Sequence, residues 1–128
     1  MLWNDTLRTG NPGIDFQHEE LCWLIDELQE ARTKGNLAAA LDFLVSYTRT
    51  HFRDEESFME TNGYAGLTEH RDKHREFIAT VVDFQADFLG GRLEFQTLLD
   101  FLGSWLVDHI QQVDITMMKE LEARRDWQ

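Results

Sequence analysis

Hydrophobic residues recur every three or four positions along most of the chain, which is the spacing of one face of an α-helix. Glycine-containing turns interrupt this pattern near residues 34–36, 62–66 and 90–91. The pattern therefore predicts four long helices, at about residues 16–33, 37–61, 67–89 and 93–124. Because the links between them are short, neighbouring helices must run antiparallel. We expect an all-α fold, an antiparallel up-down-up-down four-helix bundle.

The start of the chain does not follow the helical pattern. Gly10, Pro12 and Gly13 predict an irregular N-terminal arm over residues 1–14. Asp15 follows this arm and is placed to cap the first helix, because aspartate is a preferred residue at that position. Pro12 is the only proline, so no later residue of that kind interrupts the predicted helices.

The predicted inner faces also carry polar side chains. All five histidines lie within apolar stripes, and two acidic residues stand at helical distances from two of them. These seven residues are His18, His51, Glu55, His70, His74, His109 and Asp114. Burying so many polar groups is costly unless they are paired or coordinate a metal. In an antiparallel bundle all seven fall toward the same end.

The spacing of these residues suits metal coordination. His51 and Glu55 are four residues apart, as are His70 and His74, so each pair shares one helix face. Imidazole is the commonest side-chain ligand of metals, and carboxylates suit hard cations. Seven such groups could hold two metal ions, and this possibility makes the sequence informative about function.

One pair has a different spacing, because Asp114 comes five residues after His109. On an ideal α-helix five residues correspond to a rotation of about 140°. The two side chains therefore either straddle the inner face or are aligned by a local π-helical turn. The sequence leaves both arrangements open.

Composition narrows the class of protein. At 128 residues the chain fits one domain, over residues 1–128. Its net charge is −12 and it has no basic run, so a nucleic-acid partner is not expected. Cys22 is the only cysteine and is interpreted as a core thiol. Without an apolar run of ~18 residues or the pattern of a signal peptide, we expect a cytoplasmic protein that does not insert into a membrane.

The histidine-bearing segments resemble the hemerythrin family, specifically its single-domain bacterial members, the bacteriohemerythrins. The matching segments are GIDFQH at 13–18, HFRDEESFM at 51–59, NGY at 62–64, HRDKH at 70–74 and WLVDHIQQVD at 105–114. The resemblance covers nearly the whole chain. It departs from the family pattern at Ala65, where a proline is frequent, and at Glu19, where a lysine is frequent.

This resemblance implies a non-haem di-iron site with an oxo or hydroxo bridge. One iron would be bound by His70, His74 and His109, and the other by His18 and His51. Both carboxylates, Glu55 and Asp114, would bridge the two irons. In that pattern the first iron has six ligands and the second has five. Only the second iron therefore has a position for dioxygen, which hemerythrins bind reversibly.

Four apolar residues are candidates for an oxygen pocket beside the metals: Phe52, Trp105, Leu106 and Ile110. For Trp105 and Ile110, core packing alone is the favoured explanation. For Leu106 and Phe52 we expect both packing and a dry wall around the open iron. Excluding water and acids from that position would slow irreversible oxidation.

The resemblance favours reversible dioxygen binding for storage, transport or delivery, with dioxygen as the ligand and no enzymatic role. The alternative is a domain that senses oxygen, redox state or iron through a partner. A di-iron peroxidase or oxidase ranks lower, because it would need an acid or base where the sequence places apolar residues. The further partner would be an unidentified oxygen-consuming enzyme or signalling protein.

Overall fold

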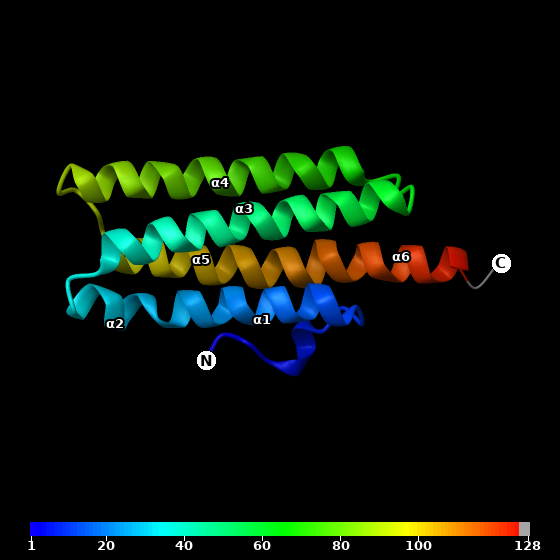
Figure 1. The fold of residues 1–128 in the computed structure, drawn as a ribbon, viewed down its shortest axis with the longest axis horizontal. Coiled ribbons are helices and arrows are strands. Elements are labelled where there is room, and N and C mark those ends of the chain that lie inside the picture. Colours follow the sequence, from blue (N-terminus) through cyan, green and yellow to red (C-terminus); the bar gives the residue numbers. More distant parts are fainter. Residues whose placement is uncertain (126–128) are drawn as a thin grey trace.

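The computed structural model describes residues 1–125 and contains four helical rods that pack side by side (Figure 1). The rods are α1 (Pro12–Asp26) with α2 (Leu28–Thr33), then α3 (Leu37–Thr61), then α4 (Leu67–Leu89), and last α5 (Phe95–His109) with a π-helix (Ile110–Asp114) and α6 (Ile115–Arg125). Successive rods run in opposite directions (Figure 1). The predicted antiparallel four-helix bundle is confirmed.

The beginning of the first helix differs from the prediction. α1 starts at Pro12, and Asn11 caps it by accepting hydrogen bonds from the backbone N–H groups of Gly13 and Ile14 at 3.0 and 3.1 Å. Proline suits this first position because its missing N–H would have no partner in the helix. The predicted start at residue 16, the cap at Asp15 and the end of the arm at residue 14 are therefore wrong.

Asp15 instead holds the arm against the bundle. Its carboxylate accepts hydrogen bonds from the N–H and the hydroxyl of Thr9, at 2.8 and 2.7 Å, and from the N–H of Gly10 at 3.3 Å. The arm itself contains a short 3-10 turn, Asp5–Leu7, whose Leu7 is fully buried. The arm is thus an ordered part of the structure.

Two further boundaries differ from the predicted helices. The first rod is interrupted at Glu27, between α1 and α2. The fourth rod begins at Phe95, two residues later than predicted, and changes to π-helix at Ile110. In the described part of the chain, no helix combines the length and the apolar character that a membrane span requires.

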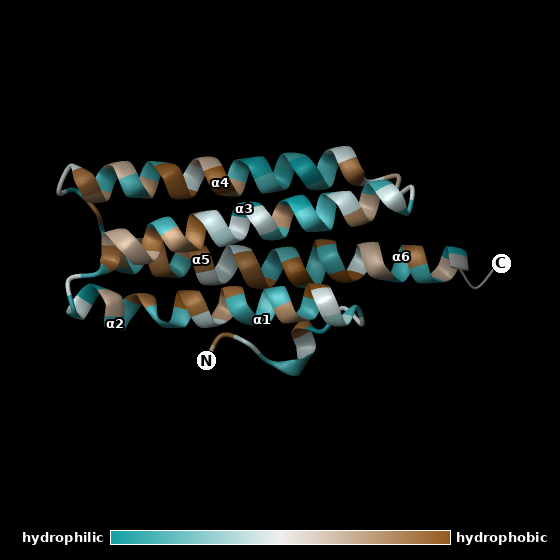
Figure 2. Ribbon diagram, in the orientation of Figure 1, coloured by the Kyte–Doolittle hydropathy of each residue, from teal (hydrophilic) through white to brown (hydrophobic). Residues whose placement is uncertain are grey.

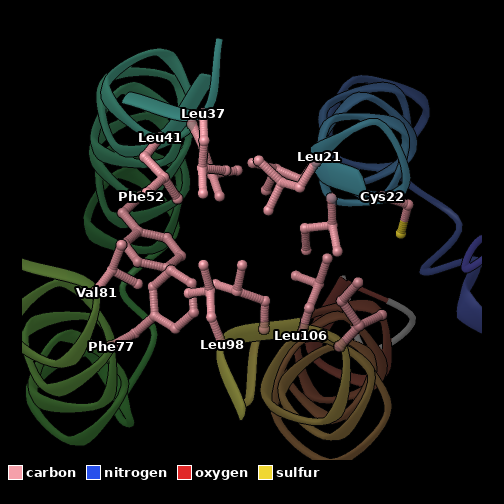
Figure 3. Packing of buried hydrophobic residues seen from close by; sticks show 14 of the residues in the cluster. Leu21, Cys22, Leu37, Leu41, Phe52, Phe77, Val81, Leu98 and Leu106 are labelled. Carbon is pink, nitrogen blue, oxygen red and sulfur yellow. The ribbon is translucent and has the colours of Figure 1, made fainter. Parts of the chain in front are cut away.

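Two hydrophobic clusters fill the bundle, one on each side of the histidines. The larger one includes Leu21, Phe52, Phe77 and Leu106, and the smaller one gathers around three methionines, Met59, Met117 and Met118. In Figure 3 the labelled side chains of the larger cluster, except that of Cys22, point into the space between the rods. Hydrophobic residues dominate one half of α3 and α4, and hydrophilic residues the other (Figure 2).

Cys22 is buried, as predicted, but it points away from the centre of the bundle (Figure 3). Burial, with the charges of Asp26 and Glu19, raises the pKa of its thiol to about 12. The thiol therefore stays protonated at neutral pH, which fits a structural role.

Candidate metal centre

The seven polar residues that the sequence singles out converge in one layer across the bundle. His18 comes from α1, His51 and Glu55 from α3, His70 and His74 from α4, His109 from α5 and Asp114 from the π-helix. None of these residues is more than 5% exposed. Since every rod contributes to the layer, the fold itself sets the distances between their side chains.

Five of these residues form a first group. The Nε2 atoms of His70 and His74 each lie 3.2 Å from Nε2 of His109. Oε1 of Glu55 lies 2.7 Å from Nε2 of His70 and 3.2 Å from that of His74. Oδ1 of Asp114 lies 2.9 and 3.2 Å from Nε2 of His70 and His109. Three imidazole nitrogens and one oxygen of each carboxylate therefore face a common point.

The other oxygens of the two carboxylates face a second group. Oε2 of Glu55 lies 3.2 Å from Nε2 of His51 and 3.5 Å from Nε2 of His18. Oδ2 of Asp114 lies 3.1 Å from Nε2 of His18. Each carboxylate thus divides its two oxygens between the two sets of histidines, three on one side and two on the other.

The π-helix resolves the alternative that the sequence leaves open. Its turns hold one more residue between hydrogen-bonded partners than an α-helix does, so side chains five apart can align. Here the backbone over Ile110–Asp114 is π-helical, and Asp114 lies on the same side as His109. The bulge therefore brings the carboxylate of Asp114 into the layer.

Two residues that the sequence analysis gave no role orient the histidines. Nδ1 of His51 donates to Oε1 of Gln17 at 2.6 Å, and the amide nitrogen of Gln17 donates to Asp54 at 2.9 Å. Nδ1 of His74 donates to Oε2 of Glu56 at 2.8 Å. A carboxylate can only accept, so the protonated nitrogen of His74 points outward and the lone pair of Nε2 points into the layer. Such outer hydrogen bonds are typical of metal-binding histidines.

Several buried atoms of the layer have no hydrogen-bond partner among the described residues. They are both carboxylate oxygens of Glu55 and of Asp114, both ring nitrogens of His18, and Nδ1 of His70. Buried polar atoms are rarely left without partners, and oxygen and imidazole nitrogen are ligands for a cation. The residues present therefore fit a metal site.

The charges in this layer stabilise one another. Desolvation alone would lower the pKa of His18 and His70, but Asp114 and Glu55 outweigh it and raise both values to about 9. Burial alone would raise the pKa of Glu55, yet the surrounding histidines hold it well below its usual range. Without a metal, the two carboxylates are therefore ionised at neutral pH and the imidazoles of His18 and His70 are protonated.

Three of the four candidate pocket residues line a small cavity, which measures about 10 Å³. Phe52, Trp105 and Leu106 contribute to its wall with Leu21, Ile25, Leu44, Thr48 and Phe77. Ile110 is fully buried in the larger hydrophobic cluster but does not line this cavity. Leu21, Thr48 and Leu106 each lie three residues from a histidine of the layer, so the cavity is one helical turn away.

Two aromatic rings pack directly on histidines. The ring of Phe52 stacks on that of His74, with centroids 3.7 Å apart and planes inclined by 2°. Trp105 stacks on His109, with centroids 4.4 Å apart and planes inclined by 11°. These contacts hold the imidazoles in place and cover them with apolar surface.

Comparisons with known proteins agree with this arrangement. The sequence profile of the Hemerythrin HHE cation binding domain matches residues 9–121. Bacteriohemerythrin of Pseudomonas aeruginosa is 33% identical over 117 residues, covering 89% of this chain and 76% of that protein. Myohemerythrin of Riftia pachyptila is 35% identical over 113 residues, covering 88% and 87%.

A solved structure gives the same result for the fold. The crystal structure of wild-type hemerythrin superposes with a TM-score of 0.84 at 30% sequence identity, covering 94% of this chain and 97% of that one. Hemerythrins are oxygen-binding proteins rather than enzymes, and these matches are all hemerythrins. By sequence, fold and the layer of cation ligands, the chain belongs to the hemerythrin family.

Proposed function

We propose that this protein binds dioxygen reversibly at a non-haem di-iron site, for storage, transport or delivery of oxygen. The observation that carries the proposal is the division of each carboxylate between two sets of histidines. Glu55 directs Oε1 to His70 and His74 and Oε2 to His18 and His51. A carboxylate in that position would bridge two ions rather than complete a closed site for one.

The ligand set is assigned as follows in this proposal. One iron would be held by His70, His74 and His109, and the other by His18 and His51. Glu55, Asp114 and a solvent-derived oxo or hydroxo group would bridge the two irons. The iron pair would supply the two electrons that reversible dioxygen binding requires. The unequal number of histidines would leave a position beside His18 and His51 open to a ligand.

The surrounding residues would keep that open position dry. Leu106 and Phe52 are 4% and 5% exposed and line the small cavity one turn from the layer. Apolar walls exclude water and acids that would convert bound dioxygen into a product that cannot be released intact. As an oxygen carrier the protein would work in the cytoplasm and supply an oxygen-consuming enzyme, or a signalling partner, of unknown identity.

The hydrogen bond from His74 to Glu56 gives a testable prediction. Replacing Glu56 with alanine is expected to lower the iron affinity by roughly 10–100-fold, because the imidazole loses the acceptor that fixes its protonated nitrogen. Competition with a coloured chelator measures this affinity. Glu60→Ala, an exposed change on the same helix, is the control and should bind iron as the unmodified protein does. Equal affinities of all three proteins would show that Glu56 does not orient His74.

Metal binding should also release protons. His18 and His70 have pKa values of about 9 in the metal-free layer, so both are protonated at pH 7, whereas an imidazole must be neutral to bind a metal. We therefore expect the apparent affinity for Zn²⁺ or Fe²⁺ to rise as the pH increases from 6 toward 9. A pH indicator in weakly buffered solution measures the release directly. Uptake of metal at pH 7 without proton release would contradict this charge assignment.

Oxygen cycling tests the proposed function. The protein would be loaded with ferrous iron without air, exposed to oxygen and then returned to an oxygen-free atmosphere while its visible spectrum is recorded. Reversible carriage predicts a colour that appears with oxygen and disappears on its removal over several cycles. Irreversible oxidation at the first exposure, or peroxide turnover with an electron donor beyond that of free iron, would refute it.

A further inference from the structure

We propose that a groove between α3 and α4 binds a small, planar, anionic electron carrier of the flavin mononucleotide class, which returns an oxidised metal centre to its ferrous state. The need for those electrons rests on the proposed function, but binding in the groove does not. The groove has a volume of about 570 Å³, within the range of about 300–1,000 Å³ that is typical of small-molecule sites.

The groove combines an apolar floor with a cationic rim. Apolar side chains of both helices line it, among them Phe52, Ile78 and Val82. Val82 is 41% exposed, so the groove presents apolar surface to solvent. A flat aromatic ring could bury that surface by lying along the helices. This floor suits the isoalloxazine ring of a flavin better than it suits a free phosphate.

Three arginines, Arg49, Arg53 and Arg75, lie around that floor. Among the described residues, no carboxylate lies within ion-pair distance of Arg49 or Arg53, and both are exposed. Arg75 has only an exposed contact with Asp72 at 3.7 Å, which contributes little. In a protein with a net charge of −12, this is a local positive site, and arginine binds phosphate in two-pronged geometry.

The one acidic residue of the groove is already engaged. Glu56 accepts hydrogen bonds from Nε of Arg71 at 3.0 Å and from His74 at 2.8 Å. Its negative charge is therefore balanced by a partner that does not line the groove. The free cations Arg49 and Arg53 determine which ligands the groove attracts, and these are anions.

The groove also reaches the metal centre. His74 contributes to its wall, and Phe52, which stacks on His74, lines both the groove and the inner cavity. Nε2 of His74, on the other side of the ring from the nitrogen that bonds to Glu56, lies 3.2 Å from Oε1 of Glu55. A planar donor in the groove would thus lie near His74, which is a member of the layer, and its electrons would not need to cross solvent.

The electron transfer balances. Two ferric ions accept one electron each, the reduced flavin is oxidised to flavin, and two protons are released to solvent. A flavin can give up its electrons one at a time, which matches two ions that each accept one. The reductant is the two-electron reduced form of FMN, and no further reactant is required.

Binding of oxidised FMN to the metal-free and the iron-loaded full chain tests the proposal. Quenching of FMN fluorescence measures the dissociation constant. We expect saturable binding to both forms, weakened at least about tenfold in the double variant Arg49→Glu/Arg53→Glu, which is about 1.4 kcal/mol. Lys34→Glu, a reversal of charge at an exposed residue that does not line the groove, should bind FMN as the unmodified protein does.

Two further probes identify what is recognised. Riboflavin, which lacks the phosphate, should bind more weakly than FMN, and inorganic phosphate alone should compete poorly with it. Equal binding of riboflavin and FMN, equal loss in the Lys34→Glu control, or no saturable binding of FMN would overturn the proposal. Anaerobic mixing of the ferric protein with reduced FMN measures the rate of iron reduction. At limiting flavin this rate should fall in the double variant.

These results separate the two proposals. If the protein binds FMN through Arg49 and Arg53 but does not bind oxygen reversibly, the FMN site is supported and the proposed oxygen carriage is contradicted. If the protein binds oxygen reversibly but does not bind FMN, the proposed function is supported and the FMN site is contradicted. Neither outcome depends on the other measurement.

Discussion

Replacing Glu55 with alanine is expected to abolish the binding of a metal pair. Glu55 is the only residue of the layer whose two oxygens face all five histidines, with distances from 2.7 to 3.9 Å. Its loss removes one bridge and leaves the two groups connected only through Asp114. The fall in iron affinity should exceed the roughly 10–100-fold expected when an outer hydrogen bond is lost.

Iron content after desalting measures this effect, with circular dichroism to establish that the variant is folded. Glu55→Gln serves as a second variant, because it preserves the size of the side chain and removes the negative charge. It should also fail to retain two ions. If either variant kept two ions at the affinity of the unmodified protein, Glu55 could not be the bridging ligand.

Replacing Leu106 with aspartate is expected to accelerate the autoxidation of the oxygenated protein. Leu106 is buried in the wall of the small cavity, one turn before His109, so the new carboxyl would bring a proton donor and water beside the open position. Decay at least about ten times faster requires a barrier lower by only about 1.4 kcal/mol. The decay of the visible absorption of the oxygenated form measures the rate.

Two companion variants separate the causes of that acceleration. Leu106→Ile keeps the wall apolar and should decay at nearly the original rate. Leu106→Asn introduces polarity without an ionisable proton and should fall between the other two. An unchanged decay in Leu106→Asp, with iron content and fold intact, would mean that this wall does not protect the site.

The sequence predicts the convergence of the seven polar residues better than it predicts the ends of the helices. Five histidines on apolar stripes are unusual because buried polar groups require partners, so their joint placement indicates a site before any coordinates are known. Helix ends depend on competing local contacts. Asn11 and Pro12 carry the usual signal of a helix start, but the glycines around them also suit an irregular arm.

Asp15 shows how a tertiary contact can replace a local one. Its carboxylate is suited to cap a helix, but it bonds to Thr9 and Gly10 because Asn11 already occupies the capping position. Gln17 and Glu56 are similar cases. Along the sequence they look like ordinary polar residues of an exposed face, and only the packing of one rod against another shows that they bond to His51 and His74.

The π-helix illustrates a limit of periodicity. The spacing of His109 and Asp114 is compatible with an α-helix that presents them on different sides and with a bulge that aligns them. In the folded bundle the backbone over Ile110–Asp114 is π-helical, and the carboxylate of Asp114 lies beside His18 and His70 from two other rods. The cationic groove follows the same rule, since Arg49 and Arg75 lie on different helices and meet only in the folded bundle.

We propose that one chain holds an iron pair with a single position for dioxygen. Parallel titration of the metal-free protein with ferrous iron, and of the loaded protein with oxygen, tests it most directly. We predict two irons per chain and one dioxygen per two irons, released intact when oxygen is removed. Saturation at one iron per chain, or oxygen consumption that removing oxygen does not reverse, would contradict the assignment.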